Sequence, residues 1–193
     1  IADLTIFFVL ETEFVITYLP HILHSFICWF NFIIDYMFFK IMKSIENNFD
    51  DPQVNELLIK HFIELRSVSP EGSTHVLDIP GLKVPSIKFW SLWENEKLVG
   101  CGALKFLDKK HGEFKSIRIA DNFRGKGLGV KIIDHLITEA KKLNIEKLSI
   151  ETGSGSFFYS ARKLFQKCGF KPCEPFAHYK EDPNSCYFTL DLN

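Results

Sequence analysis

A glycine-rich stretch at residues 122–130 is the part of the sequence best suited to chemistry. It contains three glycines at alternate positions, Gly125, Gly127 and Gly129. Glycine lets the backbone approach a ligand closely, and such a turn can point successive N–H groups outward. Arg124 and Lys126 add positive charge beside them. The stretch therefore favours an anionic ligand, and a pyrophosphate group fits it best.

The spacing differs from that of the two best-known phosphate-binding loops. The dinucleotide motif GxGxxG would require glycine at the position of Val130, and no GK[ST] triplet closes a Walker loop. The simpler interpretation is a tight turn from a strand to a helix that carries two solvated basic side chains. Both interpretations remain open from this stretch alone.

The elements that would position this turn follow from apolar periodicity. A capping Asp51 and Pro52 begin an amphipathic helix that extends to about residue 66. Further on, the pattern predicts strands at 87–93, 97–107, 113–119, 146–152 and 187–192, and helices at 130–140 and 156–168. The glycine turn thus lies between a strand and a long helix. The order predicts an α/β or α+β fold with a mixed sheet.

Charge and cysteine content exclude several classes of protein. The 193 residues include 23 Lys and Arg against 24 Asp and Glu, which removes the electrostatic case for a nucleic-acid binder. The five cysteines are scattered and form no CxxC pair. We therefore expect a reducing, cytoplasmic location and no structural metal.

Residues 1–41 differ in composition from the rest of the chain. No charged side chain occurs between positions 14 and 34, a length sufficient to cross a bilayer. Lys40 and Lys43 follow, which would place the remainder in the cytoplasm. Three interpretations remain open: a non-native upstream extension, a membrane anchor, or a helix packed on the domain. In each of them 42–193 is the working domain, and membrane contact is expected only if 1–41 is native.

The spacing Arg-x-x-Gly-x-Gly that starts at Arg124, set between a strand and a helix, resembles the GNAT superfamily of N-acetyltransferases. The runs EKLVGCGAL at 96–104 and ARKLFQKCGF at 161–170 resemble successive elements of that family in the right order. The runs LSIETGS and EPFAHYKEDPNS resemble a small bacterial subgroup often labelled YsnE-like. The resemblance covers nearly all of 42–193.

This resemblance implies a mixed, mostly antiparallel central sheet that is flanked by helices. The strands at 113–119 and 146–152 would splay apart and form a cleft for acetyl-CoA. The backbone of Ile117, Arg118 and Ile119 would pair with the pantetheine arm as an added strand would. The pyrophosphate would be held by the turn, whose expected contacts are Arg124, Gly125, Lys126, Gly127, Leu128, Gly129 and Val130. No metal is implied.

The implied activity is acetyl transfer from acetyl-CoA to a primary amine by direct attack in a ternary complex. The amine would belong to a small molecule, an amino acid or a protein. Glu113 is the expected general base, with Glu151 as the second candidate. The segment containing His178 and Tyr179 would face the acceptor. We expect a monomer or a homodimer.

The general acid is where the sequence departs from the family. Phe165 occupies the position of the usual tyrosine, so Tyr159, Ser156 or water would have to replace it, or the thiolate leaves unprotonated. This departure motivates an alternative function, an acyl-CoA-binding module with little or no turnover.

Overall fold

The computed structural model describes residues 42–70 and 72–192, so the interpretations of 1–41 lie outside the described residues. A boundary between two units of the chain falls after Met42, and the fold below belongs to the second unit. Within the described residues, no helix combines the length and the apolar character needed to span a membrane.

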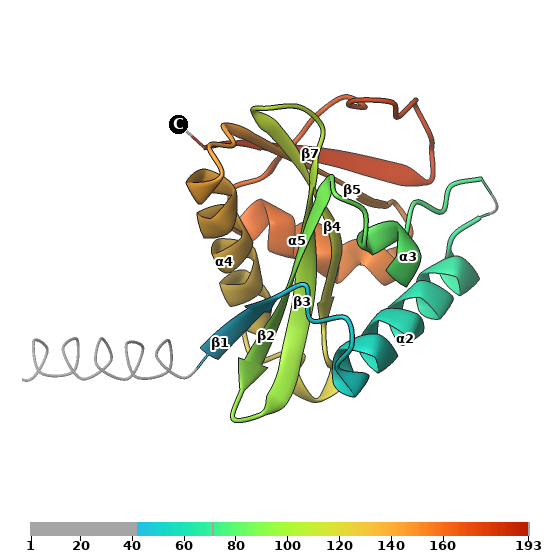
Figure 1. The fold of residues 1–193 in the computed structure, drawn as a ribbon. Coiled ribbons are helices and arrows are strands. Elements are labelled where there is room, and N and C mark those ends of the chain that lie inside the picture. The colour runs from blue at the N-terminus through green and yellow to red at the C-terminus, as the bar shows by residue number, and fades with distance from the viewer. Residues whose placement is uncertain (1–41, 71, 193) are drawn as a thin grey trace, which may run out of the picture. The chain divides into compact units, whose positions relative to one another are not determined.

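The second unit is built on a seven-stranded sheet with the order β1-β2-β3-β4-β5-β7-β6 (Figure 1). Its strands are β1 Met42–Glu46, β2 Ile87–Glu94, β3 Lys97–Phe106, β4 His111–Ile119, β5 Lys147–Gly153, β6 Lys171–Pro172 and β7 Ser185–Asp191. The pairs β2–β3, β3–β4, β5–β7 and β6–β7 are antiparallel, whereas β4 and β5 are parallel. The predicted mixed, mostly antiparallel sheet is confirmed.

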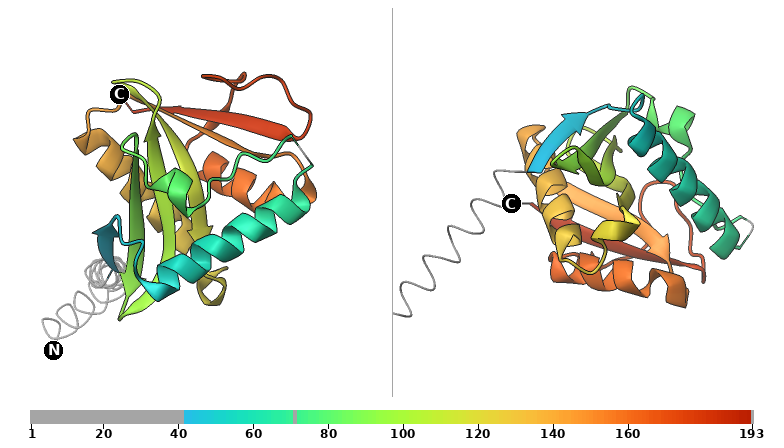
Figure 2. Two further views of the ribbon diagram at one scale, coloured as in Figure 1. Left: turned by 45° about the vertical axis from the view of Figure 1, so that its right-hand side comes forward. Right: turned by 90° about the horizontal axis from the view of Figure 1, so that it is seen from below.

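Helices cover both faces of this sheet. They are α2 Pro52–Val68, α3 Ile79–Leu82, α4 Leu128–Lys142 and α5 Tyr159–Lys167. Figure 2 shows α2 and α3 on one face and α4 and α5 on the other. The Asp51 side chain caps α2 by accepting a hydrogen bond from the N–H of Gln53 at 2.8 Å, which confirms the predicted helix start.

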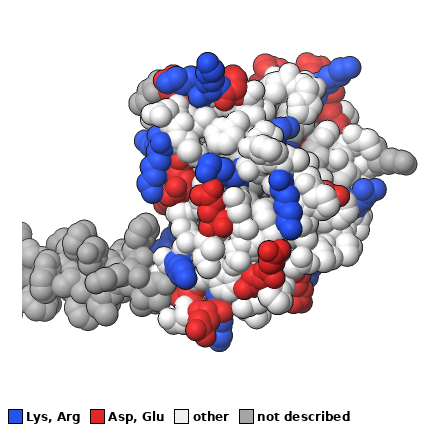
Figure 3. All heavy atoms as spheres, viewed as in Figure 1, with Lys and Arg blue, Asp and Glu red and all other residues white. Residues whose placement is uncertain are grey.

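Two hydrophobic layers hold the helices to the sheet. On the α2 side, a buried cluster joins Val54, Leu57 and Leu58 to the sheet residues Phe89 and Trp93. On the other side, α4 buries a stripe that consists of Leu128, Ile132, Ile133, Leu136 and Ala140. Figure 3 shows acidic and basic side chains interspersed over the face seen in Figure 1, as the balanced charge leads one to expect.

Two strands and one α-helix were not predicted, and all three are short. β1 has five residues, α3 four and β6 two, so none repeats often enough to show a period. α4 begins at Leu128, two residues before the predicted start. Gly127 is the last residue of the turn with a left-handed backbone, so the helix can start at the next residue. The buried apolar stripe of α4 also includes Leu128.

Gly100 on β3 gives a direct test of this packing. A Cβ atom at Gly100 would lie 2.3 Å from the carbonyl oxygen of Arg118 and 2.6 Å from Cδ1 of Ile132. We expect Gly100→Ala to lower the free energy of unfolding by about 1–3 kcal/mol, measured by denaturant titration. Gly155→Ala is the control, because a Cβ at Gly155 has no atom within 4 Å. Equal stability of the two variants would contradict the packing.

Candidate active site

The strands β4 and β5 pair only at their beginnings. Their last paired residues are Glu113 and Ser149, and beyond this point the strands separate. β4 also carries a bulge, because Arg118 pairs with Cys101 but Lys115 pairs with Ala103. Ser116 in the bulge has a φ of 51°, in the left-handed region. A bulge bends its strand and increases its twist, which helps β4 to turn away from β5.

A cleft of about 540 Å³ occupies the space between the two strands. Residues of β4, β5, α2, α5 and the loop after α2 form its walls. Among them are His61, Leu65, His75, Lys115, Ser116, Arg118, Arg124, Gly125, Glu151, Phe157, Ser160 and Phe165. One cleft therefore extends from the glycine turn to the carboxylate of Glu151.

The backbone of β4 presents open hydrogen-bonding groups to this cleft. The N–H of Ala120 donates to the carbonyl of Val99 on the β3 side at 2.9 Å. Because successive residues of a strand turn to opposite edges, Arg118 faces β3, whereas Ile119 and, across the bulge, Ile117 face the cleft. These two residues have the orientation that an added strand-like ligand requires.

The glycine turn has the geometry of an anion site. Gly125 and Gly127 both have a φ of 75°, and a Cβ at either position would have no atom within 4 Å. α4 begins directly after Gly127, and no side chain caps it. Apart from that of Val130, the N–H groups of its first turn therefore lack helical acceptors, and the turn carries the positive end of the helix dipole. The turn fits a pyrophosphate group.

The members of the turn differ in what they do. A Cβ on Gly129 would lie 2.8 Å from Cδ2 of Leu164, so this glycine permits helix packing and not ligand approach. The N–H of Val130 donates to the carbonyl of Gly127 at 3.3 Å and is not fully open to a ligand. Lys126 lies over the ring of Phe123, 5.3 Å from its centroid.

The side chain of Arg118 is buried between β4 and α2. Its Nη1 lies 2.5 Å from Oε2 of Glu64, and its Nη2 lies 3.5 Å from Oδ1 of Asp121. Asp121 also pairs with Nε of Arg124 at 3.2 Å. The side chain of Arg118 thus faces α2. The glycine turn leads into α4, which lies on the opposite face of the sheet (Figure 2).

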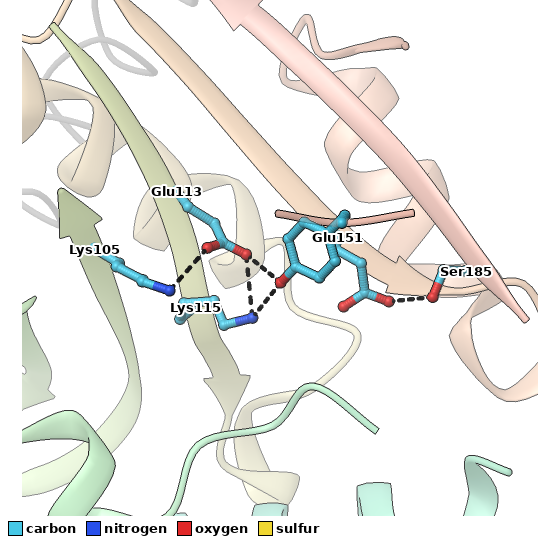
Figure 4. Close-up of polar contacts among 6 residues, drawn as sticks. Lys105, Glu113, Lys115, Glu151 and Ser185 are labelled. Carbon is cyan, nitrogen blue, oxygen red and sulfur yellow. Dashed lines mark hydrogen bonds and ion pairs between the residues drawn. The ribbon is translucent and has the colours of Figure 1, made fainter. Parts of the chain in front are cut away.

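Glu113 is fully buried in a network of polar side chains (Figure 4). Its Oε1 lies 3.1 Å from Nζ of Lys115 and accepts a hydrogen bond from the hydroxyl of Tyr179 at 2.6 Å. Its Oε2 lies 3.9 Å from Nζ of Lys105. Burial and the nearby Glu113 carboxylate raise the pKa of Tyr179 well above its usual range. Glu113 does not line the cleft, and its role as general base stays a prediction.

Glu151 is the carboxylate that does line the cleft. It accepts a hydrogen bond from the hydroxyl of Ser185 at 2.7 Å (Figure 4). Burial raises the pKa of Glu151, whereas the Ser185 hydrogen bond and the charge of Lys115 act in the opposite direction. The balance leaves its carboxyl group easier to protonate than an exposed glutamate.

Tyr159, the general acid expected from the sequence, does not line the cleft, whereas Phe165 does. Tyr159 is 56% exposed, lies outside the cleft lining and has Nζ of Lys163 5.6 Å from its ring centroid. Phe165 is 4% exposed and packs against Phe170 and Phe188. Its ring has no acidic proton to donate. The role of Tyr159 stays a prediction.

Sequence reasoning missed His61, Ser116 and Ser160 as cleft residues. His61 could have been found, because it lies one helical turn from Leu57 and Leu65 on the inward stripe of α2. Ser116 could not be assigned to the cleft from the sequence, because the bulge in β4 changes the direction of its side chain. Within residues 42–70 and 72–192, no group of three His, Cys, Asp or Glu side chains is arranged to hold a metal.

A sequence model of the acetyltransferase (GNAT) family matches residues 52–170. The chain belongs to the GNAT family of acetyltransferases. Over 140 residues it is 47% identical to a Bacillus subtilis protein named "Uncharacterized N-acetyltransferase YsnE", covering 72% of this chain and 93% of that protein. Over 141 residues it is 43% identical to "Uncharacterized N-acetyltransferase YedL" of Escherichia coli, covering 73% and 89%. These relatives confirm the resemblance to a YsnE-like subgroup and an enzyme of the acyltransferase class.

Solved structures share the fold. A Bacillus subtilis acetyltransferase in complex with CoA aligns with a TM-score of 0.59 and 19% identity, over 79% of this chain and 99% of that chain. An Elizabethkingia anophelis GNAT acetyltransferase with acetyl-CoA bound aligns with a TM-score of 0.55 and 19% identity, over 78% and 98%.

Proposed function

We propose that this protein transfers an acetyl group from acetyl-CoA to a primary amine by direct attack in a ternary complex. The observation that carries the proposal is the single cleft lined both by Glu151 and by Arg124 and Gly125 of the glycine turn. Membership of the GNAT family and the N-acetyltransferase names of its relatives support it. The amine belongs to a small molecule, an amino acid or a protein.

The chain's backbone holds the cosubstrate. The amides of Gly125, Gly127 and the first turn of α4 bind the pyrophosphate, and the open edge at Ile117 and Ile119 pairs with the pantetheine arm. When bound, acetyl-CoA supplies an acetyl group activated as a thioester. The N–H of Ile117 or Ile119 is placed to donate to the thioester oxygen as negative charge develops there.

Glu151 is the general base that we favour. A primary amine is mostly protonated at neutral pH and must lose a proton before or during attack. A carboxylate in the cleft can take that proton, and a raised pKa brings its basicity closer to what this transfer needs. In this proposal Glu113 has a positioning role, because its contacts hold the side chains of Lys115 and Tyr179 in place.

The leaving group, the thiolate of CoA, does not require a general acid. When the amine nitrogen bonds to the carbonyl carbon, the carbon–sulfur bond breaks and the electron pair stays on sulfur. A thiol pKa near ~8.5 allows the thiolate to leave without a general acid. This is consistent with the apolar surroundings of Phe165.

Steady-state kinetics of the full chain test this proposal. Initial rates of thiol release are measured while acetyl-CoA and an amine are varied together. Direct attack in a ternary complex predicts intersecting reciprocal plots. Parallel plots would indicate an acetylated enzyme and contradict the mechanism. If no amine from a broad panel stimulates thiol release, the proposed activity is wrong.

A further inference from the structure

Three polar side chains on the α2 side of the cleft have buried atoms without a hydrogen-bond partner. They are His61 (Nδ1), Ser116 (Oγ) and Arg118 (Nε and Nη2). All three residues line the cleft, and His61 and Arg118 are each only 7% exposed. Buried polar groups in native proteins are almost always hydrogen-bonded. Water or a ligand in the cleft would complete their bonding, and a ligand that binds here would find these groups available.

The charges around these atoms favour an anion. The ion pairs at this end of α2 involve three cations, Lys60, Arg118 and Arg124, and two carboxylates, Glu64 and Asp121. The network thus has one surplus positive charge when Arg124 of the glycine turn is counted with it. Burial and the charges of Arg118 and Arg124 lower the pKa of His61 to about 4, so it is neutral and offers one donor and one acceptor.

This anion site lies apart from Glu151. It adjoins the glycine turn, because Oδ1 of Asp121 contacts both Nη2 of Arg118 and Nε of Arg124. Ser149 is the last residue of β5 that pairs with β4, and Glu151 lies two residues beyond it. Arg118 lies further along β4, beyond the bulge. Its side chain turns toward Glu64 on α2, whereas the glycine turn begins α4 on the other face of the sheet. The cleft therefore has room for an amine near Glu151 and an anion near Arg118 on the α2 side.

We propose that the acetyl acceptor carries a carboxylate in addition to its amine, and that Arg118, with His61 and Ser116, binds this carboxylate. The inference rests on the proposed function and narrows its substrate class. Arginine suits the task because its planar fork matches the two oxygens of a carboxylate. A hydrogen bond to a charged group makes the carboxylate worth about 10- to 100-fold in kcat/KM.

Matched acceptors test the proposal on the full wild-type chain. One series is glycine, β-alanine, 4-aminobutanoate and 5-aminopentanoate, and the other contains the alkylamines with the same carbon chains but no carboxylate. We expect a preference of at least about tenfold for the carboxylated compound at one or more lengths. Equal kcat/KM at every length would overturn this inference and leave the proposed function intact. Transfer to neither series would overturn this inference, and the proposed function would fail only if the broad panel of amines also gave no thiol release.

Variants identify the side chains responsible. Arg118→Lys keeps the charge but loses the fork, and we expect it to raise KM for the preferred acceptor while the Kd for acetyl-CoA stays unchanged. If instead acetyl-CoA binding weakens and the acceptor preference stays, the anion is a phosphate of the cosubstrate and the inference is wrong.

His61→Leu gives a second measurement should Arg118→Lys not fold. It should reduce the preference for the carboxylated acceptor. His135→Leu is its control, because His135 also has a buried nitrogen without a partner but does not line the cleft. Equal effects of the two histidine variants would count against the site.

Discussion

Glu151→Gln is expected to lower kcat/KM for acetyl transfer by about 100- to 10,000-fold, the usual contribution of a general base. Glutamine keeps the size and can still accept the hydrogen bond from Ser185. The Kd for acetyl-CoA should stay within about twofold, because the cosubstrate is held by backbone groups. Thiol-release kinetics and binding measurements on the same preparation separate the two effects.

The pH dependence of this variant follows from the raised pKa of Glu151. A carboxyl whose pKa is raised by folding adds stability at low pH and loses it as pH rises through the folded pKa. Above that value the buried charge opposes folding, so Glu151→Gln should be at least as stable as the parent at pH 7–8. The acidic limb of the kcat/KM profile should lie above the usual glutamate pKa of ~4.3 and be absent in the variant.

Glu146→Gln is the matched control for Glu151→Gln. Glu146 lies next to the start of β5, is half exposed and pairs with Lys110 at 2.6 Å, outside the cleft. We expect its kcat/KM to equal that of the parent. If Glu151→Gln is as active as the parent, the base assignment is wrong. If the parent itself binds acetyl-CoA without turnover, the alternative of an acyl-CoA-binding module is correct.

Gly127→Glu is expected to weaken acetyl-CoA binding by at least about 100-fold. The new carboxylate would lie beside the first turn of α4, where it would compete with the pyrophosphate for N–H groups and repel it. Cβ itself meets no atom within 4 Å, but φ is 75°. The left-handed backbone costs a side chain about 1–2 kcal/mol, which a domain of this size tolerates.

A thermal-unfolding assay measures this effect. Acetyl-CoA at a concentration that saturates the parent should raise the Tm of the parent by mass action and raise the Tm of Gly127→Glu much less. Gly127→Asn is the control for backbone strain, because asparagine tolerates a positive φ and adds no charge. An equal rise of Tm in the parent and in Gly127→Glu would show that the turn does not hold the cosubstrate.

The sequence predicted the long elements because their periods repeat. The five inward apolar residues of α4 exceed one helical repeat, and β2 and β3 are long, almost continuously buried runs of eight and ten residues. The glycine turn was predicted from spacing, but the different task of Gly129 was not. Its role depends on the side chain of Leu164 on α5, which is remote in sequence.

The choice between the two carboxylates needed the tertiary structure. On sequence grounds Glu113 and Glu151 both lie on strands beside the expected cleft. The carboxylate of Glu113 accepts a hydrogen bond from the hydroxyl of Tyr179, 66 residues away, and pairs with Nζ of Lys115. The divergence of β4 from β5 after Ser149 leaves Glu151 in the cleft wall. The hydrogen bond from Tyr179 and the divergence of the two strands both depend on residues far apart in the sequence, so no local pattern predicts them.

The most direct test of the central claim is a calorimetric titration of acetyl-CoA into the full, folded chain. We expect micromolar binding with release of heat at one site per chain, because the glycine turn and the edge of β4 are already formed. No binding by a protein with a cooperative unfolding transition would contradict it.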